Sequence, residues 1–418
     1  MSDYDKASIA GEHGAASQMA MSIILRMQSI LGFDQLMDIS AAHIDSTVYM
    51  GIATMEFAER LASLGAKVAV PSTLNVSGVD ETGWRSWSVP PEHAANAYRQ
   101  MVAYESMGCI PTWTCAPYQT EHRPVFGQQV AAGESNAIAF FNSIIGARTE
   151  RYPDLLDICC AITGRVPKMG LHLSQNRAGD LHVILEDDVP DRLMESDVFF
   201  PVIGHIMGQL AGQEIPVLSG LRGSPSEDQL KAVCAAAATS GGVAMFHIVG
   251  VTPEAATESD AFLDSIPRQT YRIGRRELRT AYEELSTLPE GSPIELVLLG
   301  SPHFSVDEFR RLANLVKGRK CAGGVRMIVT CSRVVREIVK STEMGVILED
   351  FGVSLTVDTC PLTTPMLGDS RKTIVTNSAK YALYSPGLLN ADAAFGSLED
   401  CVESAVQGKY IVEGSEWE

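Results

Sequence analysis

Apolar and polar positions in the second half of the chain alternate in the order expected of buried strands separated by helices. The apolar runs are short and nearly continuous, which is typical of strands covered on both faces. They fall at 295–299, 325–330 and 353–357. Between them, apolar residues recur at helical spacing over 306–317 and from Ser332, the expected N-cap, to about residue 343. This β-α-β-α-β order predicts parallel strands with right-handed crossovers.

The first half of the chain shows the same pattern less regularly. Helical spacing predicts a helix within 5–31, starting near Ala15 because Gly11 and Gly14 interrupt the pattern, and further helices over 52–64 and 95–107. Short strands are expected at 67–71 and 110–113, each running into a loop. Ligands of open α/β sheets bind beyond the carboxyl ends of the strands, so these loops are candidate site positions.

Composition agrees with an α/β fold of more than one domain. The chain has 418 residues, of which 45% are hydrophobic and 7% aromatic, and it contains 35 glycines. This is enough apolar surface for a large core, and the few aromatic residues favour an α/β fold over a β-sandwich. Arg, Glu, Pro and Gly are concentrated over 265–294. We therefore expect two regions, 1–280 and 281–418.

The formal net charge of −18 argues against nucleic acid and against a membrane surface as partners. A small anionic substrate is still compatible, because one cationic side chain or helix N-terminus can hold a carboxylate. The N-terminus lacks the pattern of a signal peptide, and no run reaches the ~18 apolar residues of a membrane-spanning helix. We expect a cytoplasmic protein whose nine cysteines are reduced thiols or metal ligands.

Three cysteines have neighbours that set them apart. They are Cys115 in Thr-Cys-Ala-Pro-Tyr, Cys360 in Asp-Thr-Cys-Pro and Cys401 in Leu-Glu-Asp-Cys-Val, at turn-like positions or the ends of expected elements. Three thiolates from distant parts of a chain can hold an iron–sulfur cluster and leave one iron free to act as a Lewis acid on a hydroxyl group. The alternative is that they pack as small apolar residues. A zinc hydrolase is a weaker option, because histidine pairs at ligand spacing are missing.

Polar residues at expected helix starts supply the other candidates. Residues 376–380, Thr-Asn-Ser-Ala-Lys, follow a strand-like stretch and offer N–H groups, hydroxyls and an ammonium to an anion, although an ordinary helix cap is the alternative. Glu134 heads a helix, and Arg148 comes two residues after Gly146, in a position where it could hold a carboxylate. The candidates for catalysis are Lys380, Arg148 and His43. Those for substrate binding are Thr73, Asn75, Glu134, Ser135, Asn136, Thr149, His172, Asn377 and Ser378.

A set of motifs, taken in order along the whole chain, carries a family resemblance. These motifs are Gly-Glu-His-Gly (11–14), Ser-Ala-Ala-His (40–43), Pro-Ser-Thr-Leu-Asn (71–75), Thr-Cys-Ala-Pro-Tyr (114–118), Gly-Glu-Ser-Asn-Ala (133–137), Asn-Ser-Ile-Ile-Gly-Ala-Arg-Thr (142–149), Ala-Ile-Thr-Gly-Arg-Val-Pro (161–167), Gly-Leu-His (170–172), Phe-His-Ile-Val-Gly-Val-Thr-Pro-Glu-Ala (246–255), Asp-Thr-Cys (358–360), Thr-Asn-Ser-Ala-Lys (376–380) and Leu-Glu-Asp-Cys-Val-Glu-Ser-Ala-Val-Gln-Gly-Lys (398–409). Together they resemble aconitase X, the large-subunit branch of the aconitase superfamily.

The resemblance implies an aconitase-like α/β fold of several linked subdomains with mostly parallel sheets. It also implies that Cys115, Cys360 and Cys401 hold an iron centre, which three thiolates allow to be [4Fe–4S], [2Fe–2S] or a single iron. Aconitase-like enzymes use a small swivelling domain thought to carry a serine base. Nothing in this sequence resembles that domain, so we expect it on a separate partner chain in a heterodimer.

The family dehydrates small hydroxy acids, which implies an iron-dependent hydro-lyase. We favour cis-3-hydroxy-L-proline as substrate and 1-pyrroline-2-carboxylate as product, because the chain lacks a Lys/Arg-dense site suited to phosphate. Mevalonate 5-phosphate is the alternative substrate, and a non-catalytic iron- or redox-sensing protein is the alternative of another class. Residues 150–152, Glu-Arg-Tyr, depart from the family's Asn-Arg-Glu, so we carry substrate contacts no further than Thr149.

Overall fold

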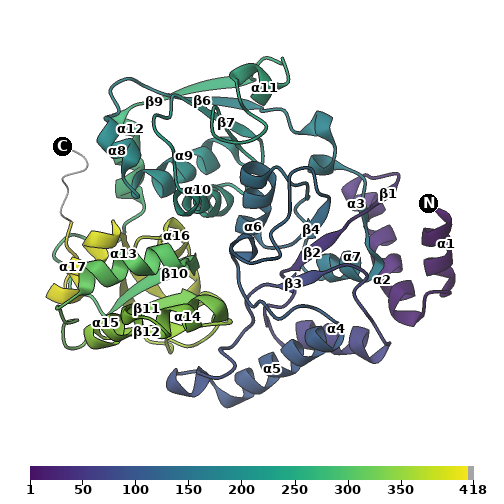
Figure 1. Ribbon diagram of the computed structural model, residues 1–418, viewed down its shortest axis with the longest axis horizontal. Helices are drawn as coiled ribbons and strands as arrows, with labels where there is room; N and C mark the ends of the chain where they lie inside the picture. The colour runs from purple at the N-terminus through teal and green to yellow at the C-terminus, as the bar shows by residue number, and fades with distance from the viewer. Residues whose placement is uncertain (413–418) are drawn as a thin grey trace.

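The computed structural model describes residues 1–412 and shows three regions, each built around its own parallel sheet (Figure 1). The first region, coloured purple to blue, lies on the right of the figure, and the second, in teal, lies at the top. The third, green to yellow, lies at the lower left, with helix α10 of the second region between it and helix α6 of the first. The α/β fold with mostly parallel sheets is thus confirmed. The last six residues of the expected region 281–418 lie outside the described residues.

The first region holds a three-stranded parallel sheet in the order β3-β2-β4 and a two-stranded antiparallel sheet, β1-β5. Its strands are β1 (Leu36–Asp38), β2 (Ala41–Ile44), β3 (Ser72–Leu74), β4 (Val130–Ala132) and β5 (Arg165–Pro167). Its helices are α1 (Asp3–Ala10), α2 (Ala15–Arg26), α3 (Gln28–Leu31), α4 (Ile52–Ser63), α5 (Pro91–Ser106), α6 (Ser135–Phe140) and α7 (Leu156–Thr163). The expected helix start near Ala15 is confirmed, and α5 begins earlier than expected because Pro91 occupies its first turn.

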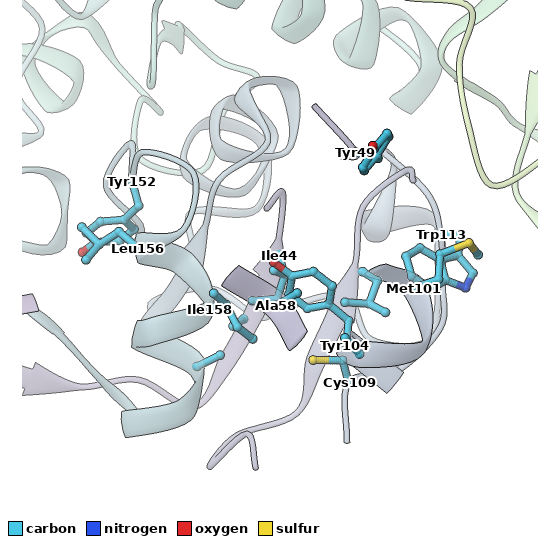
Figure 2. Packing of buried hydrophobic residues seen from close by; sticks show 14 of the residues in the cluster. Ile44, Tyr49, Ala58, Met101, Tyr104, Cys109, Trp113, Tyr152, Leu156 and Ile158 are labelled. Carbon is cyan, nitrogen blue, oxygen red and sulfur yellow. The ribbon is translucent and has the colours of Figure 1, made fainter. Parts of the chain in front are cut away.

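The core of the first region packs helices α4, α5 and α7 around strand β2 (Figure 2). Ile44, Ala58 and Ile158 meet there with exposed fractions of zero. Tyr104 on α5 is also fully buried, and its hydroxyl donates to the Ser46 carbonyl oxygen at 3.0 Å. This bond fixes the turn that follows β2, which is one wall of the cleft described below.

The two short strands expected in this region differ from those observed. Residues 67–71 do not form a strand, because the N–H groups of Val68 and Ala69 donate to two different segments, at Met107 and Ala161, rather than to one neighbouring strand. The strand lies instead at β3, immediately afterwards. Residues 110–113 run beside β3 with a single bridge, since Pro111 has no N–H to continue the ladder.

The second region has a four-stranded parallel sheet in the order β8-β7-β6-β9. Its strands are β6 (Leu181–Leu185), β7 (Pro216–Ser219), β8 (His247–Ile248) and β9 (Gln269–Ile273). Its helices are α8 (Asp191–Glu195), α9 (Phe199–Ala211), α10 (Glu227–Ser240), α11 (Glu258–Phe262) and α12 (Arg275–Glu284). Helices α9 and α10 approach closely where Gly204 and Gly208 face the backbone of α10, so this pair forms a rigid wall toward the other two regions.

The third region has a five-stranded parallel sheet in the order β12-β11-β10-β13-β14. Its strands are β10 (Leu296–Phe304), β11 (Arg326–Cys331), β12 (Val353–Thr356), β13 (Lys372–Thr376) and β14 (Ala391–Phe395). Its helices are α13 (Val306–Val316), α14 (Arg333–Lys340), α15 (Glu343–Phe351), α16 (Ala379–Leu388) and α17 (Leu398–Gln407). The predicted β-α-β-α-β order is confirmed, including Ser332 as the N-cap of α14, whose hydroxyl accepts from the Val335 N–H at 3.3 Å.

Strand β10 changes direction at Gly300, and its register with β11 shifts there. Gly300 has φ +94°, and a Cβ at this position would lie 2.2 Å from the carbonyl oxygen of Thr330. The residues after Gly300 are thereby turned toward the cleft.

Gly300→Ala should therefore destabilise the protein by roughly 2–5 kcal/mol, from left-handed backbone strain together with the close contact. Gly324→Ala is the matched control, because Gly324 has the same φ of +94° and no atom lies within 4 Å of the place that a Cβ would take. That control should cost about 1–2 kcal/mol from the backbone alone. Urea unfolding of both variants measures the difference, and equal losses would show that the contact with Thr330 contributes nothing.

None of the helices within residues 1–412 combines the length and the apolar character needed to cross a membrane.

Candidate active site

A cleft of about 1120 Å³ lies where the carboxyl ends of strands from the first and third regions face each other. Asp45, Asn75 and Glu134 follow β2, β3 and β4 respectively, so the three parallel strands of the first region present polar side chains at one edge. From the third region, Cys360 follows β12 and Lys380 lies in the first turn of α16, after β13. The carboxyl ends of parallel strands are where open α/β sheets bind ligands, which makes this cleft the candidate site.

Cys115 and Cys360 both line this cleft and are both buried. Cys115 reaches it because residues 110–114 run along β3, with the Thr114 N–H donating to the Leu74 carbonyl oxygen at 3.1 Å. Burial raises the pKa of the Cys115 thiol to about 12, with further contributions from the charge of Glu134 and a smaller one from Cys360. Burial likewise raises the pKa of Cys360. Without a cation, both sulfurs stay protonated at neutral pH.

Cys401 lies elsewhere, which corrects the expected three-cysteine set. Ser397 and Asp400 form a capping box that starts α17 at Leu398, so Cys401 sits one turn into the helix rather than at the end of an element. Its side chain is fully buried in the apolar cluster under the third sheet, with Val297 and Leu299 of β10. It does not line the cleft, and the part of the chain that the structure describes brings together no group of three or more His, Cys, Asp or Glu side chains that could hold a metal.

Lys380 and Glu134 form an ion pair across the cleft, with 3.0 Å between Nζ and Oε1. The Glu134 carboxylate also caps α6, accepting from the Ala137 N–H at 2.6 Å. Burial lowers the pKa of Lys380, but the charge of Glu134 and the hydrogen bond to it outweigh this effect and raise the pKa above its ordinary value. Lys380 is therefore a fixed cation at neutral pH and cannot serve as a base.

Sequence reasoning missed His303, which ties the two cysteine segments together. The backbone N–H of His303 donates to Cys115 Sγ at 3.3 Å. Its ring lies between two oxygens, with Nδ1 at 3.0 Å from Thr114 Oγ1 and Nε2 at 3.3 Å from the Thr359 carbonyl oxygen. A carbonyl oxygen can only accept, so Nε2 carries the proton and Nδ1 accepts from Thr114. Burial lowers the pKa of His303 to about 4, which keeps the ring neutral. Its position after the apolar run 295–299 was the sequence signal that could have found it.

Behind His303, three charged side chains from α10 and α13 hold its backbone in place. Lys231 Nζ donates to the His303 carbonyl oxygen at 3.3 Å and to Asp228 at 2.9 Å, and it also pairs with Glu308. Burial lowers the pKa of Lys231, but the two carboxylates raise it above its ordinary value. This ion cluster is contributed by the second and third regions together, so it fixes how their elements meet beside Cys115.

His43, Arg148 and His172 do not line the cleft, although the sequence suggested roles for them at the site. The His43 ring is buried against Thr73, with 2.9 Å from Nδ1 to Oγ1, and burial lowers its pKa to about 3. Arg148 points away, donating to Ser174 Oγ at 2.8 Å and to the His172 carbonyl oxygen at 3.3 Å. His172 is held between the Tyr152 hydroxyl at 2.5 Å and Gln129 Oε1 at 2.6 Å. We assign none of the three a direct part in chemistry.

Some of the remaining candidate residues line the cleft, and the others lie behind it. Asn75, Glu134 and Ser135 line the cleft, whereas Thr73, Asn136, Thr149, Asn377 and Ser378 do not. Asn136 is fully buried and holds the Cys115 carbonyl oxygen at 3.0 Å. Thr149 Oγ1 accepts from the Ala132 N–H at 3.1 Å, and Ser378 caps α16 and donates to the Ser301 carbonyl oxygen. Asn377 and Ser378 border a smaller cavity on the other side of residues 300–304.

Glu150 and Arg151 belong to the segment 150–152, to which we carried no substrate contacts from the sequence, and both line the cleft. The backbone of Arg151 forms a bridge to Ala132, so it extends the edge of the first sheet beyond β4. Its guanidinium Nη1 donates to the Gly242 carbonyl oxygen at 2.5 Å, and no carboxylate among residues 1–412 pairs with it. Arg151 is therefore a cation that can accept an anionic ligand group without breaking an ion pair.

Chemically, the cleft offers two buried thiols, two cations and several carboxyl groups. Thiolates suit soft or borderline metals such as iron, and two protein thiolates leave coordination positions for other ligands. The backbone donors at Cys115 and at Cys360, where the Leu362 N–H lies 3.4 Å from Sγ, are of the kind that stabilises metal-bound sulfur. The residues present thus fit an iron centre on Cys115 and Cys360.

Three models of one family match the chain in order. The model described as aconitase X first domain matches residues 1–175, the second-domain model matches 179–283, and the third-domain model matches 294–407. Each matched segment contains one of the three parallel sheets. The second and third segments meet at 283–294, inside the stretch 265–294 that is rich in Arg, Glu, Pro and Gly.

Individual relatives agree with the family models. Cis-3-hydroxy-L-proline dehydratases of Pseudomonas aeruginosa and Hypocrea jecorina are each 44% identical to this chain over 97% and 98% of it, which spans 70% and 69% of their lengths. The phosphomevalonate dehydratase large subunit of Methanothermobacter thermautotrophicus is 36% identical over 92% of this chain and 93% of its own length. The crystal structure of holo-form aconitase X from Thermococcus kodakaraensis has a TM-score of 0.86 and 29% identity, covering 97% of this chain and 99% of that one. The chain belongs to the aconitase X family of dehydratases.

Proposed function

We propose that this protein dehydrates cis-3-hydroxy-L-proline to 1-pyrroline-2-carboxylate. The observation that carries the proposal is the cleft itself, where Cys115 and Cys360 lie beside the Lys380–Glu134 ion pair at the carboxyl ends of two parallel sheets. The two relatives at 44% identity bear the name of this activity. Their similarity extends over nearly all of this chain, so it includes both cysteine segments.

Cys115 and Cys360 would hold an iron centre, either a cluster or a single iron. When bound, iron supplies a Lewis acid that binds the substrate's hydroxyl group and helps it to leave. His303 and Asn136 hold Cys115 in place through its sulfur and its carbonyl oxygen. The solved aconitase X structure is described as a holo form, which supports a bound cofactor in this family.

The chain's own cations would position the substrate. Arg151 would take the role that the sequence suggested for Arg148, because it lines the cleft and its guanidinium has no carboxylate partner among the described residues. Lys380 provides a second fixed positive charge next to the cysteines. A carboxylate held between these groups would direct the substrate ring toward Cys115 and Cys360. The resulting enamine product tautomerises to 1-pyrroline-2-carboxylate.

The charge around the cleft favours an amino acid over a phosphate ester. Its lining contains five carboxyl groups and only two cationic side chains. The carboxyl groups belong to Asp45, Glu134, Glu150, Asp154 and Asp180, and the cations are Arg151 and Lys380. A zwitterionic substrate has a carboxylate for one cation and an ammonium for the acidic lining. The doubly charged phosphate of mevalonate 5-phosphate would meet net negative charge.

The alternative of an iron- or redox-sensing protein is less well supported. A thiol sensor needs an exposed cysteine with a lowered pKa. Cys115 and Cys360 are buried, and burial raises the pKa of both thiols. Relatives that carry the name large subunit indicate a small partner subunit, which we propose supplies the base that removes the Cα proton.

The test is turnover by the anaerobically purified chain together with a co-expressed small subunit. We expect 1-pyrroline-2-carboxylate from cis-3-hydroxy-L-proline, measured as its adduct with o-aminobenzaldehyde, and at least 100-fold lower kcat/KM with mevalonate 5-phosphate, which corresponds to roughly 2.7 kcal/mol of discrimination. Preference for the phosphate ester would overturn the substrate assignment. Inactivity toward both hydroxy acids in iron-loaded protein would overturn the dehydratase proposal.

A further inference from the structure

Asp45 lines the cleft close to Glu134 and Asn75, and no cation among the described residues pairs with it. It follows β2 directly, and its N–H donates to Asp157 Oδ2 at 2.6 Å, which fixes the backbone at this point. One of its carboxyl oxygens, Oδ1, accepts from Asn75 Nδ2. For the other oxygen, residues 1–412 offer no hydrogen-bond donor, and the side chain lines the cleft. That oxygen is available to a ligand.

The surroundings of Asp45 favour a neutral carboxylic acid. Glu134 at the head of α6, Asp154 in the loop before α7 and Asp157 within α7 face it, and Asn75 after β3 is its uncharged neighbour. Burial raises the pKa of Asp45 well above the usual value for an aspartate, and the charges of Glu134, Asp154 and Asp157 raise it further. The nearby ammonium of Lys380 is committed to Glu134 at 3.0 Å.

Asn75 decides which oxygen of a neutral Asp45 carries the proton. Its side chain is 2% exposed, and its Nδ2 donates to Asp45 Oδ1. Because Oδ1 accepts this hydrogen bond, the proton of a neutral carboxyl lies on the other oxygen, which is the one available to a ligand.

We propose that Asp45 is a catalytic residue whose carboxylic acid protonates the hydroxide that leaves C3 of the substrate. The inference rests on the proposed dehydration and adds the group that completes it. The C3–O bond breaks with its electron pair on oxygen, and that oxygen takes the Asp45 proton and departs as water. The Cα proton goes to the base, and its bonding pair forms the new double bond. Solvent then returns a proton to Asp45.

The other carboxyl groups of this part of the cleft are less suited to the role. The Glu134 carboxylate is already engaged, because it pairs with Lys380 and caps the N-terminus of α6. Asp157 accepts from the N–H groups of Asp45, Ser46 and Ile158 and does not line the cleft. Asp154 lines the cleft but is exposed to solvent.

The experiment compares two leaving groups in the unchanged enzyme and in Asp45→Asn, as iron-loaded complexes with the small subunit. Fluoride is far less basic than hydroxide and leaves without prior protonation, so cis-3-fluoro-L-proline bypasses the acid. We expect Asp45→Asn to lose roughly 10²–10⁴-fold in kcat for cis-3-hydroxy-L-proline. Fluoride release, followed with an ion-selective electrode, should change by no more than a few-fold. Iron content and Tm should not fall, because asparagine is an uncharged isostere in a site that disfavours charge.

Asp350→Asn is the control, since it makes the same change at an exposed position of α15 that does not line the cleft, and it should leave the ratio of the two reactions unaltered. A pH profile adds a second readout. With the hydroxy substrate, kcat of the unchanged enzyme should fall as pH rises through the pKa of Asp45, and this limb should be missing from fluoride release.

Equal losses of both reactions in Asp45→Asn would assign Asp45 to binding or to removal of the Cα proton, and would overturn the inference. Retention of both reactions would overturn it as well. If the unchanged complex acted on neither compound, the proposed function would fail, and the inference with it.

Discussion

Replacing Cys115 or Cys360 with serine should remove most of the bound iron and abolish dehydration, whereas replacing Cys401 with alanine should leave both intact. Cys115 and Cys360 line the same cleft, and their sulfurs accept hydrogen bonds from the backbone N–H groups of His303 and Leu362 respectively. A serine hydroxyl does not ionise near neutral pH and is a poor substitute for a thiolate ligand of iron. Iron per chain, acid-labile sulfide and the visible absorption spectrum measure the effect independently of turnover.

Cys401 is the internal control of this experiment. Its alanine variant loses one buried sulfur from the cluster beneath the third sheet, which should cost about 1–2 kcal/mol of stability. Iron content should remain that of the unchanged protein. If Cys401→Ala folded normally but lost its iron, the three-cysteine ligand set would be restored and the two-cysteine centre would be wrong.

The sequence predicts the third region more accurately than the first, and the reason lies in strand length and burial. All nine residues of β10 are buried, so the strand stands out as a largely apolar run in the sequence. Strands β3 and β4 have only three residues each, and β3 contains Ser72 and Thr73, so neither produces a recognisable pattern. Their pairing depends on contacts with β2, which are distant in sequence and invisible to periodicity.

The candidate site was predictable where a motif comes shortly after a strand, as at Cys360, or opens a helix, as at Glu134 and Lys380. It was not predictable where the outcome depends on which side of a helix or strand a side chain occupies. Cys401 comes shortly after a polar turn in the sequence, yet the capping box places it one turn inside α17, facing the sheet. His43 attracts attention as an ionisable residue, but its side chain is buried and the acid two residues later, Asp45, lines the cleft.

Lys380→Met should reduce kcat/KM at least 100-fold and destabilise the protein by roughly 3–5 kcal/mol, because it leaves Glu134 buried without its partner. The side chains of Lys380 and Glu134 are 18% and 4% exposed, so water cannot replace the lost ammonium effectively. Stability and activity fall together in this variant, and it cannot by itself separate a structural role from a functional one. Urea unfolding and steady-state kinetics should therefore be measured on the double variant Glu134→Gln/Lys380→Met as well.

The double variant removes both charges, so most of the lost stability should return. The amide oxygen of the introduced glutamine can still accept the Ala137 N–H, as the Glu134 carboxylate does at 2.6 Å, so the cap of α6 is kept. Activity should stay low, because the ammonium of Lys380 no longer helps to hold the substrate's carboxylate in the cleft that Cys115 and Cys360 line. Recovery of near-normal kcat/KM in the stable double variant would show that the ion pair only supports the fold, and Arg151 alone would then have to hold the substrate.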